Sequence, residues 1–230
     1  MVEILDIDYN SLVELVGTAH FTQRSINDAL EAVRSKRPKD VAIELDMKRY
    51  RQLSAYCARC PKAAFCKGLC EFTGAADALG NVDANIWLID MTEEEMRRRI
   101  ILWSNLYERP YMGVAMPNYG EDLARLWEMG YKEAVIEHSE RQIEALRRIN
   151  PAIPRVLIDE RNVLMAARLA WIASKEPSQN SKILAFVGAA HVKGIKDLLA
   201  NPSKIRDRFR AFNLSFSEPT LVRRVAVQAA

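Results

Sequence analysis

The chain contains one five-residue pattern twice, each time at the end of a short apolar run. Residues 12–16 lead into residues 17–20 (Gly-Thr-Ala-His), and residues 183–187 lead into residues 188–191 (Gly-Ala-Ala-His). Apolar runs of this length are typical of buried parallel strands, and apolar residues at helical spacing follow each histidine. Each copy therefore predicts a strand, a glycine turn with a histidine, and then a helix.

Two further segments predict strands, which gives the chain the strand–helix alternation of an α/β fold. Residues 40–46 and 85–90 are apolar runs that end in acidic side chains, and Thr92 with Glu95 forms a helix capping box. We therefore expect a mostly parallel sheet flanked by helices, with two related halves that each contribute a strand–Gly-x-Ala-His element. A length of 230 residues suits a single domain over residues 1–230.

Three more helices are predicted between the two copies of the pattern. Apolar residues recur at helical spacing over residues 121–129, 139–148 and 159–174. Glu160 and Arg161 are expected to open the last of these helices, directly after the apolar residues 156–158. The basic residues beyond position 202 indicate an exposed helix or edge rather than a nucleic-acid site.

The repeated pattern predicts a metal site built on His20 and His191. Both histidines are expected at the carboxyl ends of strands, where open α/β sheets bind their ligands, and neutral imidazole is a good metal ligand. Glu44 and Asp46 end another strand and alternate to one face. Glu44 would complete the ligand set or act as general base toward metal-bound water. The alternative for Asp46 is a helix N-cap.

Glu160 and Arg161 are candidates for catalysis as well. Glu160 could serve as the base, and the Arg161 guanidinium could bind a substrate carboxylate or stabilise an oxyanion. The alternative is that both lie on the surface, since glutamate is favoured in the first turn of any helix. The third histidine, His138, lies outside the repeated pattern and is expected on a helix surface.

The four cysteines fall together in an insertion at about residues 55–75: Cys57, Cys60, Cys66 and Cys70. Four thiolates at this density can form a tetrahedral zinc site or hold an iron–sulfur cluster, although the spacing matches no standard finger or ferredoxin pattern. Two disulfides or four free thiols are the alternatives, and disulfides are rare in the cytosol outside hyperthermophiles.

Composition limits the functional classes. Hydrophobic residues make up 49% of the chain and charged residues 27%, as in ordinary globular proteins. A formal charge of +3 does not imply a nucleic-acid partner. The acidic start does not resemble a secretory signal, and no apolar run reaches the roughly 20 residues of a membrane span. We therefore expect a cytoplasmic protein.

Several segments, taken in order, resemble the TraB/PrgY family. They are residues 16–20 (Val-Gly-Thr-Ala-His), 42–46 (Ala-Ile-Glu-Leu-Asp), 157–161 (Leu-Ile-Asp-Glu-Arg) and 186–195 (Phe-Val-Gly-Ala-Ala-His-Val-Lys-Gly-Ile). A single Gly-x-x-His is weak evidence. Two of them, separated by the Glu-Leu-Asp and Glu-Arg segments in this order, form a specific pattern across most of the chain.

The resemblance implies a Tiki-like α/β fold in which His20, His191, Glu44 and Arg161 share one pocket. Relatives include membrane-associated Wnt-cleaving metalloproteases, proteins that shut down bacterial peptide pheromones, erythromycin-esterase-like enzymes and haem-binding ChaN-like lipoproteins. The implied chemistry is metal-assisted hydrolysis with manganese or cobalt, and zinc is a further candidate. The residues expected to support the site are Gly17, Gly188, Asp46, Arg49 and Asp90.

This chain departs from the family pattern at two positions near the expected site. Met91 follows Asp90 where the family often has arginine, and Asn162 follows Glu160-Arg161 where the family often has aspartate. Many relatives also carry C-terminal transmembrane helices, which this sequence lacks. It is therefore expected to be a soluble form, or part of a longer protein that associates with a membrane.

Two functions follow from these features. The first is a metal-dependent hydrolase of the peptidase type, with a site of two histidines and a carboxylate. The second is a binding protein that sequesters a peptide or small ligand, such as haem, in the same pocket without turnover. The expected partner is a peptide or small-molecule substrate, and relatives suggest a homodimer.

Overall fold

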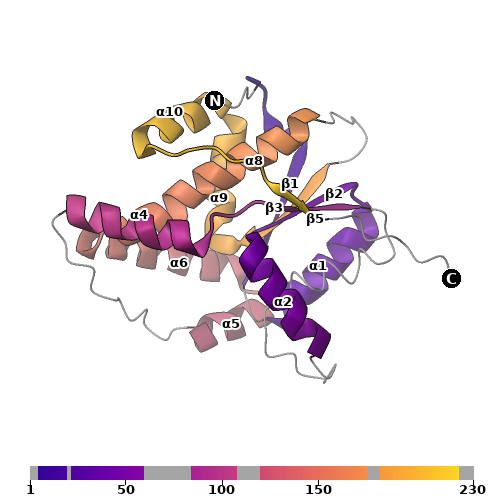
Figure 1. Cartoon of the computed structure of the whole chain (residues 1–230). Coiled ribbons are helices and arrows are strands. Elements are labelled where there is room, and N and C mark those ends of the chain that lie inside the picture. Colours follow the sequence, from indigo (N-terminus) through magenta and orange to yellow (C-terminus); the bar gives the residue numbers. More distant parts are fainter. Residues whose placement is uncertain (1–4, 20–21, 60–83, 108–119, 176–181, 223–230) are drawn as a thin grey trace.

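A five-stranded sheet lies at the centre of the computed structural model, which describes residues 5–19, 22–59, 84–107, 120–175 and 182–222 (Figure 1). The strand order is β1-β4-β2-β3-β5, and every neighbouring pair is parallel except β3 with β5. The mostly parallel α/β sheet predicted from the sequence is confirmed. The strands are β1 (Val13–Thr18), β2 (Asp40–Ile43), β3 (Asn85–Leu88), β4 (Ile183–Gly188) and β5 (Thr220–Val222).

The two strands of the repeated pattern are neighbours in the sheet. β1 pairs with β4 in parallel, and Gly17 lies opposite Val187 while Thr18 lies opposite Gly188. All six residues of β4 are buried, as expected for a central strand with helices on both faces. The sheet therefore brings the carboxyl ends of two segments that are about 170 residues apart to one edge.

Helices cover both faces of the sheet. Residues of β4 alternate between them: Ile183, Ala185 and Val187 pack in one cluster, and Leu184 and Phe186 pack in another. The first cluster includes α8, α9 and α10, and the second includes α1 and α2. These and the other helices are η1 (Tyr9–Ser11), α1 (Gln23–Lys36), α2 (Met47–Arg59), α4 (Glu93–Leu106), α5 (Gly120–Glu128), α6 (Lys132–Ile149), α7 (Ala152–Pro154), α8 (Arg161–Lys175), α9 (Ala189–Ala200) and α10 (Pro202–Phe212).

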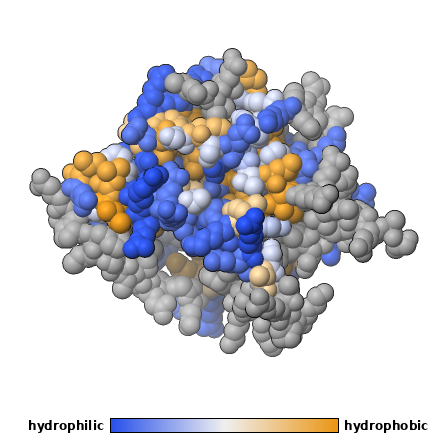
Figure 2. Space-filling model, viewed as in Figure 1, coloured by the Kyte–Doolittle hydropathy of each residue, from blue (hydrophilic) through white to orange (hydrophobic). Residues whose placement is uncertain are grey.

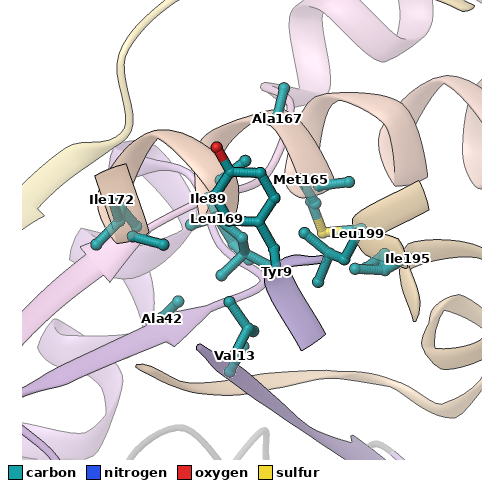
Figure 3. Packing of buried hydrophobic residues seen from close by; sticks show 14 of the residues in the cluster. Tyr9, Val13, Ala42, Ile89, Met165, Ala167, Leu169, Ile172, Ile195 and Leu199 are labelled. Atoms are coloured by element: carbon teal, nitrogen blue, oxygen red, sulfur yellow. The ribbon is translucent and has the colours of Figure 1, made fainter. Parts of the chain in front are cut away.

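The larger core cluster is organised around Tyr9 (Figure 3). Its ring is fully buried and lies among apolar side chains that include Met165 and Leu169 of α8 and Leu199 of α9. The tyrosine hydroxyl is 3.1 Å from the Ser174 hydroxyl, which satisfies its hydrogen-bonding capacity at the end of α8. This packing fixes α8, the helix that contains Arg161, against the sheet.

The start of this long helix differs from the prediction. The chain is helical from α7 through a π-helical segment, η2 (Arg155–Glu160), and directly into α8. Glu160 and Arg161 therefore do not open a helix; they lie within a continuous one, and that prediction is wrong. The physical reason is packing: Ile153 and Val156 are buried with Ile100 of α4, which favours the helix over the strand that β-branched residues suggest locally.

The other helices predicted from the sequence agree closely with helices of the structure. Thr92 caps α4 by accepting a hydrogen bond from the Glu95 backbone N–H at 3.2 Å. Hydrophilic residues cover much of the face seen in Figure 2, and apolar residues lie over the C-terminal end of α4, where Leu102 and Leu106 are exposed. None of the helices within the described residues combines the length and the apolar character needed to cross a membrane.

Candidate functional site

His191 lies directly beyond β4, in the first turn of α9, and its side chain is buried. Its Nδ1 is 2.6 Å from the side-chain oxygen of Asn162, and its Nε2 is 3.1 Å from Nη1 of Arg161. Because a guanidinium can only donate, Nε2 must accept this hydrogen bond and Nδ1 must carry the proton that Asn162 accepts. The ring is therefore the neutral tautomer with its lone pair on Nε2.

Glu44 lies at the end of β2, and its side chain points toward His191. Its backbone N–H continues the sheet by donating to the Phe186 carbonyl at 3.2 Å. The side chain is buried, and Oε2 accepts a hydrogen bond from the Gly188 backbone N–H at 2.5 Å. Oε1 is 3.4 Å from Nε2 of His191 and forms an ion pair with Arg161. The carboxyl ends of β2 and β4 thus bring one carboxylate and one imidazole together.

Arg161 joins these groups, and all of its donors are engaged. Nε donates to Asp90 at 2.8 Å, and Nη2 donates to Asp90 at 2.7 Å and to Glu44. Nη1 donates to the Leu157 carbonyl at 3.0 Å and to His191. An arginine side chain has five N–H donors, and these contacts account for each of them. Arg161 therefore holds its neighbours in fixed positions.

Asp90 is the fully buried carboxylate at the end of β3. Besides Arg161, it accepts a hydrogen bond from Nη2 of Arg49 at 2.7 Å and one from the Met91 backbone N–H at 2.7 Å. Burial alone raises the pKa of Asp90, but attraction to Arg161 and Arg49 and their hydrogen bonds hold the pKa well below its ordinary value. Asp90 is thus ionised near neutral pH and is the shared partner of two arginines.

Asp46 adopts the helix-capping role that the sequence left open as an alternative. Its side chain accepts hydrogen bonds from the backbone N–H groups of Lys48 at 2.7 Å and Arg49 at 3.0 Å, at the start of α2. It also forms an ion pair with the Arg49 side chain at 2.7 Å. Burial raises the pKa of Asp46, but the hydrogen bonds from Arg49 and its charge outweigh this effect and lower the pKa.

Oppositely charged side chains therefore alternate across the site, and the series ends at His191. Arg49 bridges Asp46 and Asp90, and Arg161 bridges Asp90 and Glu44. A further arginine, Arg168 of α8, donates to the Asp90 backbone carbonyl at 2.6 Å. With Arg168 included, the site contains three carboxylates (Glu44, Asp46 and Asp90) and three guanidinium groups (Arg49, Arg161 and Arg168).

Comparison with known proteins identifies the group to which this fold and site belong. A model of the TraB/PrgY/gumN family matches residues 90–204, half of the chain. The chain belongs to the TraB/PrgY/gumN family. It is also similar to an uncharacterized protein of Methanocaldococcus jannaschii, with 25% identity over 211 residues that cover 80% of this chain and 52% of that relative. The chain thus spans about half the length of this relative.

The segment matched by the TraB/PrgY/gumN family contains most of the site. Asp90, Arg161 and His191 lie within the matched residues, whereas Glu44 lies before them. Glu160 also lies in this segment but belongs to another cluster, in which its carboxylate is bound by Arg99, by the Trp103 indole N–H at 2.6 Å and by Arg155 at 3.3 Å.

Glycines of this TraB-family chain allow α9 to approach its neighbours closely. A Cβ atom on Gly17 would lie 3.0 Å from a methyl group of Val192. A Cβ atom on Gly194 would lie 2.2 Å from Nδ2 of Asn162, closer than real Cβ contacts. Gly194 therefore leaves the space in which Asn162 reaches His191, and Gly188 contributes its N–H to Glu44.

Sequence reasoning treated Asn162 only as a lost acid and overlooked Gly194 as part of the site. The signal was present in the sequence: Gly194 follows His191 by one helical turn, and Asn162 follows Arg161. The sequence does not show that α8 and α9 bring these residues into contact. Arg168 was also overlooked, since arginine in a long helix usually suggests an exposed face.

Several predicted positions lie outside the described residues. These are His20, Cys60, Cys66 and Cys70, and the side chain of Cys57 is also not described. Among the residues that are described, no group of three or more histidine, cysteine, aspartate or glutamate side chains is arranged to hold a metal ion. His191 and Glu44 are two ligands of the predicted set, and Nε2 of His191 lies 3.4 Å from Oε1 of Glu44, although its lone pair accepts the hydrogen bond from Arg161.

Proposed function

We propose that this TraB-family chain is a metal-dependent hydrolase with the peptidase-like chemistry of the wider Tiki-like group. The observation that carries the proposal is the tautomer of His191. Asn162 binds the Nδ1 proton at 2.6 Å, so the lone pair lies on Nε2, 3.4 Å from Glu44. A histidine that ligates a metal usually donates its other ring N–H to an oxygen acceptor, as His191 does to Asn162.

His191 and Glu44 would hold the metal together with His20, and the ion would replace the Arg161 hydrogen bond at Nε2 of His191. Manganese, cobalt and zinc are the candidates. When bound, such an ion acts as a Lewis acid and makes water a better nucleophile near neutral pH. Glu44 is the group placed to accept a proton, because Gly188 and Arg161 fix its orientation. The proposal assigns no proton transfer to Glu160, whose carboxylate is bound by two arginines and a tryptophan.

In this proposal, Arg161 is a positioning residue. It was expected to contact substrate, but each of its donors is engaged by the protein. It would therefore act by holding the Glu44 carboxylate in position, and the negative charge of Asp90 would keep Arg161 in place. Replacement of Arg161 by lysine keeps the charge but cannot reproduce these contacts, so it should lower turnover without greatly changing substrate affinity.

Metal content is the direct test. Wild type, His191→Ala and His138→Ala would be incubated with manganese, desalted and analysed for bound metal. His138 lies on α6 and belongs to neither copy of the repeated pattern, so it is the matched control. We expect about one metal per chain in wild type and in the control, and a loss of at least about tenfold in affinity in His191→Ala. Equal metal content in all three proteins would refute the site.

The same experiment includes the cysteines, for which zinc or an iron–sulfur cluster is proposed. A variant with serine at Cys57, Cys60, Cys66 and Cys70 should keep the metal held by His191. If only this variant loses metal, the cysteines are the metal centre and the histidine site is rejected. Turnover is then tested by incubating a peptide library with manganese, with and without a chelator.

The second candidate is a binding protein that sequesters a peptide or small ligand at this site. Two observations favour it: the arginines already balance the carboxylates, and no donor of Arg161 is free to stabilise developing charge. Peptides retained but not cleaved in the metal-loaded protein would support this alternative. Cleavage that is lost in both His20→Ala and His191→Ala would support the hydrolase.

A further inference from the structure

A groove distinct from the histidine site lies between α8, α10 and the chain that follows α10. In Figure 1 this chain, drawn in yellow, runs from α10 past α8 to β5. The groove has a volume of about 610 Å³, within the range of small-molecule sites. We call it the α10 groove, and the side chains used below are Trp171, Phe209, Arg210, Ser215, Phe216 and Glu218.

Aromatic side chains form much of the wall of the α10 groove. Trp171 comes from α8, Phe209 from α10, and Phe216 from the following segment. The rings of Phe209 and Phe216 have centroids 6.4 Å apart and are tilted by 51°. All three side chains are only partly buried by the rest of the protein. They therefore offer an apolar surface to a ligand.

The segment that follows α10 forms one wall of the groove, and two buried arginines hold it in place. Arg99 of α4 donates to the backbone carbonyl of Phe212, at the beginning of the segment. Arg168 of α8 donates to the Ser217 carbonyl at 3.0 Å and to the Ser217 hydroxyl at 2.6 Å, near its end. Leu214 adds a backbone hydrogen bond to Phe209 at 2.9 Å. The groove is therefore preformed, which lowers the entropic cost of binding.

The charge at the groove favours an anion. Arg206 and Arg210 lie one helical turn apart on α10 and line the groove, against one carboxylate, Glu218. Arg210 is exposed, and among the described residues no hydrogen bond or ion pair of its side chain is found. A guanidinium in this position can form charge-assisted hydrogen bonds to a ligand carboxylate.

We propose that the α10 groove binds a small amphipathic carboxylate, of the medium-chain fatty acid class. Its alkyl chain would lie against Trp171, Phe209 and Phe216, and its carboxylate would contact Arg210. None of these residues contributes to the contacts of His191 or Glu44. The groove is thus a second site, independent of the proposed hydrolase.

The test is isothermal titration calorimetry of the full chain with sodium decanoate below its micelle concentration. Arg210→Glu should weaken binding by at least about tenfold, because it replaces attraction by repulsion. Arg208→Glu is the matched control: it makes the same charge change on α10 but does not line the groove, so binding should stay within about twofold. His191→Ala should bind decanoate like wild type.

A second variant covers the case in which Arg210→Glu fails to fold, as judged by circular dichroism. Ser215 is exposed and lines the groove, so Ser215→Trp fills it and should abolish decanoate binding. The proposal is overturned if wild type does not bind decanoate, or if decyltrimethylammonium binds equally well. It is also overturned if the two arginine variants behave alike, or if Ser215→Trp binds normally.

Discussion

Replacement of Gly194 by alanine should have opposite effects on stability in two backgrounds. Gly194 lies within α9, where alanine is intrinsically favoured over glycine by about 0.8–1.0 kcal/mol. In wild type, however, the added Cβ atom would lie 2.2 Å from Nδ2 of Asn162. Asn162 is buried and bonded to His191 at 2.6 Å, so its side chain cannot move without losing that contact.

The magnitude follows from three contributions. Overpacking costs about 1–3 kcal/mol and the lost hydrogen bond about 1 kcal/mol, against the helix-propensity gain of about 1 kcal/mol. Gly194→Ala should therefore lower the free energy of unfolding by about 1–3 kcal/mol in wild type. In an Asn162→Ala background the obstructing side chain is absent, and the same change should raise stability by up to about 1 kcal/mol.

Urea unfolding followed by far-UV circular dichroism measures all four proteins of this double-mutant cycle. The coupling energy between positions 162 and 194 should be about 2–4 kcal/mol, at or above the upper end for residues in contact. Metal affinity offers a second readout, since Gly194→Ala alone releases His191 from its orienting partner. Stabilisation by Gly194→Ala in wild type, or equal effects in both backgrounds, would refute the close packing of α8 on α9.

Three further predictions concern the buried charges. Asp90→Asn should lower the free energy of unfolding by about 3–5 kcal/mol in urea, because Arg161 and Arg49 lose their shared carboxylate; a loss below about 1 kcal/mol would contradict this. The folded-state pKa of Asp90 lies below its unfolded value of about 3.9, so its contribution is complete above that pH and is lost as the pH falls further. Acid titration of wild type should therefore show a steeper loss of stability below about pH 4 than titration of Asp90→Asn, and parallel curves would count against it. Glu160→Gln should destabilise by about 3–5 kcal/mol through Arg99 yet leave metal content unchanged, whereas a loss of metal would connect Glu160 to the site.

The four parallel strands were predictable from the sequence, whereas the fifth strand was not. Apolar runs such as residues 183–187 carry their own signal, because a strand buried on both faces needs apolar side chains on both. β5 has three residues, of which Thr220 and Leu221 are exposed, so no such signal exists. Its antiparallel pairing with β3 depends on the path of the chain after α10.

The helical start of α8 shows how packing can override a local preference. Residues 156–158 are Val-Leu-Ile, which by themselves suggest a strand. In the fold they form a π-helical segment, with Val156 buried against Ile153 and Ile100. A π-helical turn shifts the register of the residues that follow it. Glu160 and Arg161 bind in different clusters because adjacent residues of a helix point to different sides.

The sequence by itself determined the α/β class, the two strand–Gly-x-Ala-His segments and the chemical types available for a site, because strand and turn signals are local. It also determined that Asp46 could cap a helix. Only the tertiary structure decided which groups meet: Glu44 with His191, Asp90 with Arg161, and Asn162 with the imidazole. Partners in buried ion pairs are chosen by the strand order and by the rotation of α8 and α9, which depend on packing across the whole core rather than on neighbouring residues.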